Sequence, residues 1–144
     1  MPSLVGSEMC IRDRPKVDRK LIAKKADIVS DLKKIIKAEN ILDHEDQTRP
    51  FETDALSAYK QKPLAVVFPE NTEQVSQILS FCNKERLKVV PRGAGTGLSG
   101  GALPLRDAIL LSLGKFNKIL EIDFENKCYT IAHGYKWVEY NMKM

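Results

Sequence analysis

One run of glycines constrains the fold of this 144-residue chain more than any other feature. Residues 91–101 read PRGAGTGLSGG, with five glycines in the nine positions from 93 to 101. Apolar runs flank it at 87–90 and 108–113, so the sequence predicts a glycine loop between two strands. Glycine permits positive φ and has no Cβ, so several amides can converge closely on an anion such as phosphate. A plain turn needs fewer glycines, which favours a binding loop.

Side chains in the loop add further donors. Thr96 and Ser99 carry hydroxyl groups, and Arg92 offers a bidentate cationic partner if its side chain turns inward. The loop contains no lysine, whereas the Walker phosphate loop ends in Gly-Lys-Ser/Thr. The Walker class of nucleotide-binding protein is therefore excluded.

The dinucleotide fingerprint of Rossmann proteins is harder to separate. Gly95, Gly97 and Gly100 satisfy G-x-G-x-x-G, and the acids Glu121 and Asp123 follow at roughly the spacing of a ribose-binding residue. A Rossmann loop must open a helix, whose N-terminus receives the pyrophosphate. The residues after this loop include a proline and lead into a strand, so we interpret the match as accidental.

The rest of the chain alternates helical and strand patterns. Apolar residues at helical spacing predict one amphipathic helix or two short ones within 17–38, and a helix capped by Asn71 or Thr72 with an inner face of Val75, Ile78, Leu79 and Cys82. Residues 40–51 lack a period and are predicted to be a connector. Further strands are predicted at 64–68, 118–123 and 128–132, which gives a mixed α+β fold.

Composition limits the class of protein. The chain is 43% hydrophobic and 29% charged, and no apolar run approaches the roughly 20 residues of a membrane span. The net charge of +4 comes largely from lysines near 16–37, typical of a solvated helix face rather than a nucleic-acid surface. The three widely spaced cysteines, Cys10, Cys82 and Cys128, fit neither a disulfide framework nor a metal site. We expect a soluble protein in a reducing, cytoplasmic compartment.

The first residues are set apart from the rest. Residues 1–14, MPSLVGSEMCIRDR, show no periodicity and no signal-peptide pattern, and they resemble a translated sequencing adaptor. We predict a non-native segment at 1–14, an N-terminal helical segment and connector at 15–47, and the first part of a truncated ligand-binding domain at 48–144. The apolar residues Trp137, Val138 and Tyr140 suggest the start of another helix near the last residue.

Several segments together carry a family resemblance. VVPRGAGTGLSGGALPL at 89–105, DALSAY at 54–59, VVFPENTEQVSQILSFCNKE at 66–85 and KFNKILEID at 115–123 resemble the FAD-linked oxidases of the glycolate oxidase and D-lactate dehydrogenase type. These proteins share the vanillyl-alcohol-oxidase-like, PCMH-type FAD-binding fold. The resemblance implies a small mixed sheet with flanking helices, preceded here by the N-terminal helical segment.

The resemblance also implies site residues. The matching loop wraps the FAD pyrophosphate, which transfers that role to Arg92, Gly93, Ala94, Gly95, Thr96, Gly97, Ser99 and Gly100. Pro69 matches a position near the adenine half of FAD, although it serves equally well as a strand-ending residue. Gly134 matches a later glycine of the family, whereas its neighbour His133 departs from the pattern and is interpreted as a loop or surface residue.

No catalytic or metal-binding residue is predicted. Asp54 is expected to cap a short helix beginning at Ala55 and Leu56, and Tyr59 to pack its ring, so a structural role is favoured over a functional one. His44 lies in the polar connector. Scattered carboxylates show no acid–base pairing: Glu70, Glu73, Glu121, Asp123 and Glu125.

The implied activity is oxidation of a 2-hydroxy acid to the 2-oxo acid by a flavin-dependent parent protein. Its partners would be FAD, the substrate and an electron-acceptor subunit, with no nucleic acid and no transmembrane segment, and it would be cytoplasmic or peripherally membrane-bound. This chain alone would bind FAD without activity. The alternatives are a nicotinamide-dependent Rossmann dehydrogenase fragment, a basic nucleic-acid-binding module, and a truncated product without autonomous function.

Overall fold

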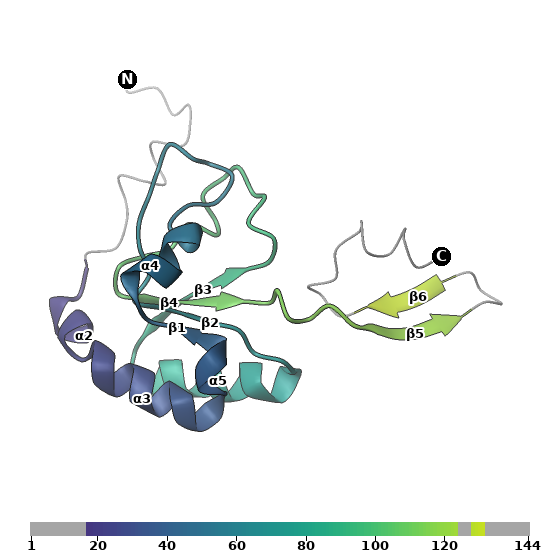
Figure 1. Ribbon diagram of the computed structural model, residues 1–144, viewed down its shortest axis with the longest axis horizontal. Coiled ribbons are helices and arrows are strands. Elements are labelled where there is room, and N and C mark those ends of the chain that lie inside the picture. Colours follow the sequence, from purple (N-terminus) through teal and green to yellow (C-terminus); the bar gives the residue numbers. More distant parts are fainter. Residues whose placement is uncertain (1–16, 124–127, 132–144) are drawn as a thin grey trace, which may run out of the picture.

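The computed structural model describes residues 17–123 and 128–131 (Figure 1). Its elements follow in this order: α2 (Arg19–Ala23), α3 (Lys25–Ile35), the 3-10 turn η1 (Ala38–Asn40), β1 (Ile41–Leu42), α4 (Glu45–Thr48), the 3-10 turn η2 (Arg49–Phe51), β2 (Ala65–Val67), α5 (Thr72–Lys84), β3 (Lys88–Arg92), β4 (Ala108–Ser112), β5 (Ile119–Asp123) and β6 (Cys128–Ile131). The mixed α+β fold is therefore confirmed.

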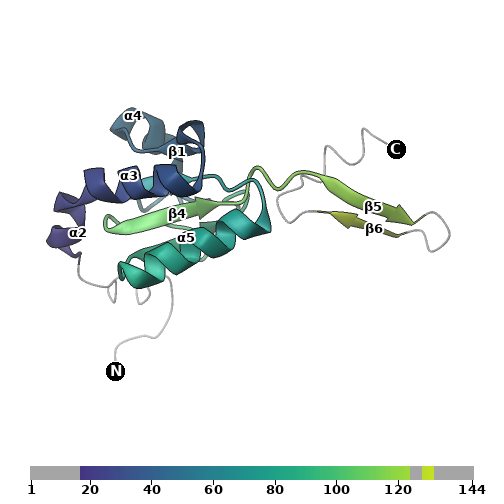
Figure 2. The ribbon, with the colours of Figure 1, turned by 90° about the horizontal axis from the view of Figure 1, so that it is seen from below.

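The main sheet has the strand order β1-β2-β4-β3. β2, β4 and β3 run parallel, and β1 pairs antiparallel with β2, so the sheet is mixed. β5 and β6 form a separate antiparallel pair, which both views show extending away from the main sheet (Figures 1 and 2). β4 is thus a central strand held on both sides, while β3 lies at the edge within the described residues.

Alternation along the strands divides the core between two faces. Ala65, Val67 and Ile109 point to the face covered by α3 and α5 (Figure 2), where the helices contribute Ile28, Leu32, Ile78 and Cys82. Val66, Val90 and Leu110 point to the opposite face, where Phe51 and Phe68 pack edge to face. Because both faces are covered, all five residues of β4 are buried, as is typical of a central parallel strand.

The helix α5 begins as predicted, since the Asn71 side chain accepts the Gln74 amide at 2.9 Å. Its inner face differs in one position, because Leu79 is 46% exposed. The partly buried Phe81 packs against the core on the other flank of Ile78, so the buried stripe is rotated away from Leu79.

The segment predicted as a connector, residues 40–51, contains β1, α4 and η2. Ile41 pairs with Val67 and Leu42 with Val66, so this segment supplies an edge strand of the sheet. The strand has two residues, too short for an alternating pattern to register in the sequence.

Candidate functional site

The glycine loop, defined here as residues 92–101, leaves the carboxyl end of β3. β3 pairs in parallel with β4 over five positions, so the chain must return along the length of the sheet between them. Residues 93–107 make that return in bends and turns without a helix. A parallel connection of this kind normally contains a helix, and an irregular one is more often a binding loop. The missing helix also removes the support that a Rossmann site requires.

Two of the five glycines, Gly95 and Gly100, adopt backbone conformations that favour glycine. Gly95 and Gly100 have φ of +73° and +74°, the left-handed region that side chains disfavour. A Cβ on Gly95 would lie 2.6 Å from Arg92 Cζ and 2.8 Å from Nε, because the Arg92 side chain passes against this residue. A Cβ on Gly100 would contact Leu56 Cδ2 at 3.7 Å.

The other three glycines face open space. A Cβ at Gly93, Gly97 or Gly101 would meet no protein atom within 4 Å, and none of the three has a positive φ in that region. Neither packing within the described structure nor backbone conformation requires glycine there. All three residues are exposed, and their backbone amides donate to no acceptor among the described residues, so these amides are uncovered. Uncovered amides are what close approach of a phosphate demands.

Arg92 is committed to the protein. Its guanidinium donates to the Thr53 carbonyl at 2.6 Å and lies over the Phe51 ring, 5.6 Å from its centroid. Burial lowers the pKa of Arg92, and the negative charge of Asp54 opposes this effect. The side chain therefore ties the loop to a supporting segment, residues 51–56.

The remaining loop residues predicted from the sequence are accessible. Ala94, Thr96 and Ser99 are exposed, and so is Leu98, at 71% of its surface. The hydroxyl groups of Thr96 and Ser99 thus lie where they can add to the uncovered amides. Gly134 lies outside the described residues.

Asp54 does not cap a helix, because residues 54–60 form only bends and turns. Its Oδ1 accepts the Leu56 amide at 2.9 Å, which closes a local turn in place of a helical cap. The residue is 6% exposed, and its Oδ2 has no hydrogen-bond partner among the described residues. An aspartate side chain can accept from a nearby backbone amide either as a helix cap or in a local turn, and the sequence does not distinguish the two.

Pro69 lies at the carboxyl end of β2, on the same edge of the sheet as the start of the glycine loop. Its side chain is fully buried, so a ligand would reach it through the main chain. In open sheets, ligands bind beyond the carboxyl ends of parallel strands. Pro69 and the glycine loop thus share the edge on which a ligand is expected.

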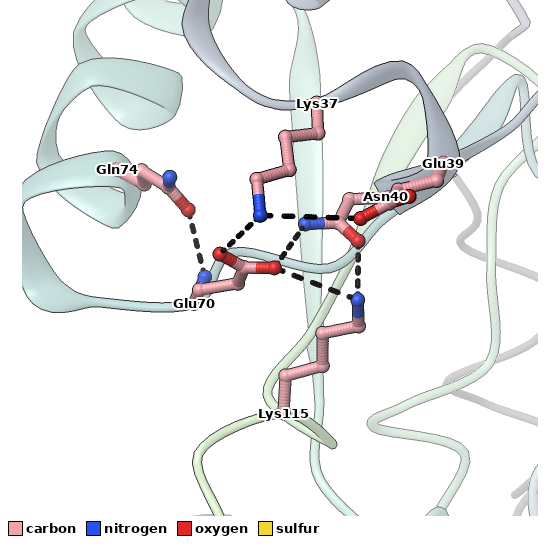
Figure 3. Close-up of polar contacts among 6 residues, drawn as sticks. All are labelled: Lys37, Glu39, Asn40, Glu70, Gln74 and Lys115. Atoms are coloured by element: carbon pink, nitrogen blue, oxygen red, sulfur yellow. Dashed lines mark hydrogen bonds and ion pairs between the residues drawn. The ribbon is translucent and has the colours of Figure 1, made fainter.

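Next to Pro69 lies a cluster that the sequence did not indicate, the edge cluster (Figure 3). Its members come from η1 and its flank, the turn before α5 together with the first turn of that helix, and the turn after β4: Lys37, Glu39, Asn40, Glu70, Gln74 and Lys115. The fully buried Asn40 donates to Glu70 Oε1 at 3.0 Å and accepts from Lys115. Lys37 and Lys115 lie 3.6 and 3.7 Å from the Glu70 carboxylate.

The electrostatics of the edge cluster are balanced around Glu70. The Asn40 hydrogen bond chiefly lowers the pKa of this carboxyl, with desolvation opposing it and the two lysines adding to the decrease. The cluster links three chain segments at the carboxyl edge. An isolated asparagine before two apolar residues gives no sequence signal for such a role.

A cavity of about 870 Å³ lies elsewhere, near the amino ends of β2 and β4. Its lining includes Lys25, Glu45, Lys62, Leu64 and Arg106, and no residue of the glycine loop. Lys62 pairs with Glu45 at 2.7 Å, so part of its charge is already compensated. The concave space and the uncovered amides are therefore separate features.

The geometry defines a class of domain: a mixed sheet whose three parallel strands carry, at their carboxyl edge, an exposed glycine loop suited to a phosphate-bearing ligand. A family model described as an FAD binding domain matches residues 63–143, more than half of the chain. The chain belongs to this family, and FAD is the cofactor that membership indicates.

Relatives and a solved structure agree with this assignment. The glycolate oxidase subunit GlcD of Escherichia coli K12 is 44% identical over 76% of this chain and 21% of its own length. A mitochondrial D-2-hydroxyglutarate dehydrogenase of Arabidopsis thaliana is 39% identical over 66% of this chain and 17% of its own. The structure of p-cresol methylhydroxylase with substrate bound matches with a TM-score of 0.70 and 24% identity, over 88% of this chain and 25% of that one.

These comparisons confirm the PCMH-type fold and the resemblance to FAD-linked oxidases. The chain spans about a fifth of the length of the glycolate oxidase subunit it matches. Within residues 17–123 and 128–131, no helix has the length and apolar character to cross a membrane.

Proposed function

We propose that the glycine loop holds the pyrophosphate of FAD. The observation that carries the proposal is the open space over Gly93 and Gly97, where glycine has no internal reason to occur. Amides at these positions, with the hydroxyls of Thr96 and Ser99, supply donors for phosphate oxygens. The other loop residues of the sequence prediction, Ala94, Gly95 and Gly100, contribute through the backbone.

In this proposal Arg92 has two roles, supporting the loop and adding a positive charge near it. Its hydrogen bond to Thr53 and its position against Gly95 support the loop, while its charge attracts the pyrophosphate at short range. Pro69 contributes its main chain near the adenine half of FAD, since it lies on the same edge of the sheet. Gly134 stays a prediction for a residue outside the described ranges.

For the full-length parent, we propose a flavin-dependent oxidoreductase that converts a 2-hydroxy acid of the glycolate or D-lactate type into the 2-oxo acid. The names of the glycolate oxidase subunit and the D-2-hydroxyglutarate dehydrogenase support this substrate class. Bound FAD would supply the hydride acceptor. This chain would bind the cofactor without oxidising the acid by itself, and a further subunit would accept electrons from the parent protein in the cytoplasm or at a membrane surface.

The test is titration of the 144-residue chain with FAD, following quenching of flavin fluorescence, beside the Gly93→Val, Gly97→Val double variant. Saturable quenching by the wild type, lost in the variant, would support the proposal, because the two valines fill the open space. A folded wild-type chain that ignores FAD and binds NADH would overturn it in favour of the nicotinamide alternative.

A further inference from the structure

Asp54 is a buried carboxylate with an unused oxygen. The Leu56 amide satisfies Oδ1, whereas Oδ2 has no partner in the described part of the chain, and the residue is only 6% exposed. Buried polar atoms in folded proteins are almost always hydrogen-bonded, because desolvation without a partner is costly. Oδ2 therefore calls for a donor from outside the described residues.

A second buried carboxylate shows what internal compensation looks like. Asp107 is 1% exposed and also has one oxygen without a partner among the described residues. Its other oxygen, however, accepts from the Lys88 ammonium at 2.7 Å and from the Asp18 amide at 2.8 Å, so its charge is directly paired. No such ion pair joins Asp54 within residues 17–123 and 128–131.

Asp54 lies in the supporting segment, which contacts the glycine loop at two points. Thr53, its neighbour, accepts the hydrogen bond from Arg92, and Leu56 lies beside Gly100. The carboxylate is thus flanked by the residues that touch the loop on both sides of the uncovered amides at Gly97. The supporting segment therefore lies next to the proposed pyrophosphate site.

We propose that Asp54 accepts a hydrogen bond from a sugar hydroxyl of the bound flavin nucleotide, either on the ribose or on the ribityl chain. The inference rests on the proposed FAD site and adds a residue to it. Hydroxyl groups adjoin the pyrophosphate on both sides, and a carboxylate is a strong acceptor for them. The guanidinium of Arg92 nearby offsets the repulsion between this carboxylate and the phosphates.

Asp54→Asn is the decisive variant because the local turn fixes its orientation. The Leu56 amide needs an acceptor, so the asparagine oxygen takes the place of Oδ1 and its NH2 group takes the place of Oδ2. A hydroxyl donor would then face another donor. We expect FAD to bind about tenfold more weakly or worse, the loss typical of one hydrogen bond to a charged group.

The controls separate this loss from misfolding. Asp107→Asn removes an equally buried charge at the amino end of β4 and is expected to leave the Kd for FAD unchanged. If Asp54→Asn does not fold, Asp54→Ser replaces it, since serine also accepts the Leu56 amide but is too short to reach the Oδ2 position. Titrations with ADP and with FMN identify the hydroxyl, because ADP carries only the ribose and FMN only the ribityl chain.

Weaker FAD binding by the Asp54 variant, with a matching loss for ADP or for FMN, would support the inference. Equal FAD affinity of the wild type and the folded Asp54 variant would overturn it while leaving the pyrophosphate site intact. No FAD binding by the wild-type chain would instead overturn the proposed function, and this inference with it.

Discussion

Alanine substitutions at two glycines of the loop, Gly97 and Gly95, should have opposite effects on stability, and their effects on FAD binding should differ as well. At Gly97 a Cβ meets no atom within 4 Å and φ is not positive, so Gly97→Ala strains nothing. Such a loop substitution restricts the unfolded chain and stabilises the fold by about 0.4–1 kcal/mol. We expect the Tm of the ligand-free chain to stay the same or rise by roughly 2–4 °C.

Gly95→Ala should behave in the opposite way. Alanine at φ +73° costs about 1–2 kcal/mol, and its Cβ would lie 2.6 Å from Arg92 Cζ, so the guanidinium must move. The Arg92 guanidinium is the end of a flexible side chain, so it can shift at small cost, and its hydrogen bond to the Thr53 carbonyl is weakened by that shift. We expect a loss of about 1–2 kcal/mol, mainly from the backbone, and a Tm lower by roughly 3–8 °C.

FAD distinguishes the two variants further. In the proposed site the Gly97 methyl group would occupy the space between the amides and the phosphate, so losing one charge-assisted hydrogen bond should weaken binding roughly tenfold to a hundredfold. Circular dichroism melting gives the Tm, and flavin fluorescence titration gives the Kd. Wild-type affinity in a stable Gly97→Ala chain would refute the reasoning, as would a Tm loss at Gly97 equal to that at Gly95.

Three further outcomes follow from the described contacts. Burial would raise the pKa of Asp107, but the hydrogen bonds from Lys88 and the Asp18 amide lower it overall. The stability that Asp107 contributes is therefore present above pH about 4 and is lost as the pH falls further. Acid unfolding curves of Asp107→Asn should lack this pH-dependent loss of stability. Asn40→Ala should cost about 2–3 kcal/mol in urea unfolding, because it removes the hydrogen bonds of a buried side chain to two charged groups, Glu70 and Lys115. Burial raises the pKa of the Cys82 thiol to about 11, so iodoacetamide at pH 8 should label Cys82 only after unfolding, as peptide mapping would show.

The order of helices and strands was predictable because each carries a local signal. The apolar run at 64–68, the Asn71 cap and the glycine loop between two strands all agree with the structure. Parallel pairing of β3 and β4 was not predictable, since the sequence alone does not tell which strands lie side by side. The two-residue strand β1 was missed for the same reason, because its only evidence is its pairing with β2.

The candidate site divides in a similar way. The glycine loop itself is a local motif, so its position between two strands and its suitability for binding an anion could be inferred from the sequence. The contacts that support it join residues far apart in the chain, such as Arg92 with Thr53. Asp54 and Asn40 are buried polar residues whose partners are set by tertiary packing. The DALSAY segment drew attention to Asp54 without indicating its burial, and nothing in the sequence around Asn40 marks it.

The strand order also bears on how the chain acquires its shape during synthesis. β4 lies between β2 and β3 but follows both in the sequence, so the two earlier strands have no common neighbour until residues 108–112 have left the ribosome. Insertion of that central strand closes the sheet and fixes both ends of the glycine loop in the same event. If the loop holds FAD as proposed, a nascent chain should therefore gain its affinity for the cofactor abruptly, at the length where β4 emerges, rather than gradually as the glycines appear.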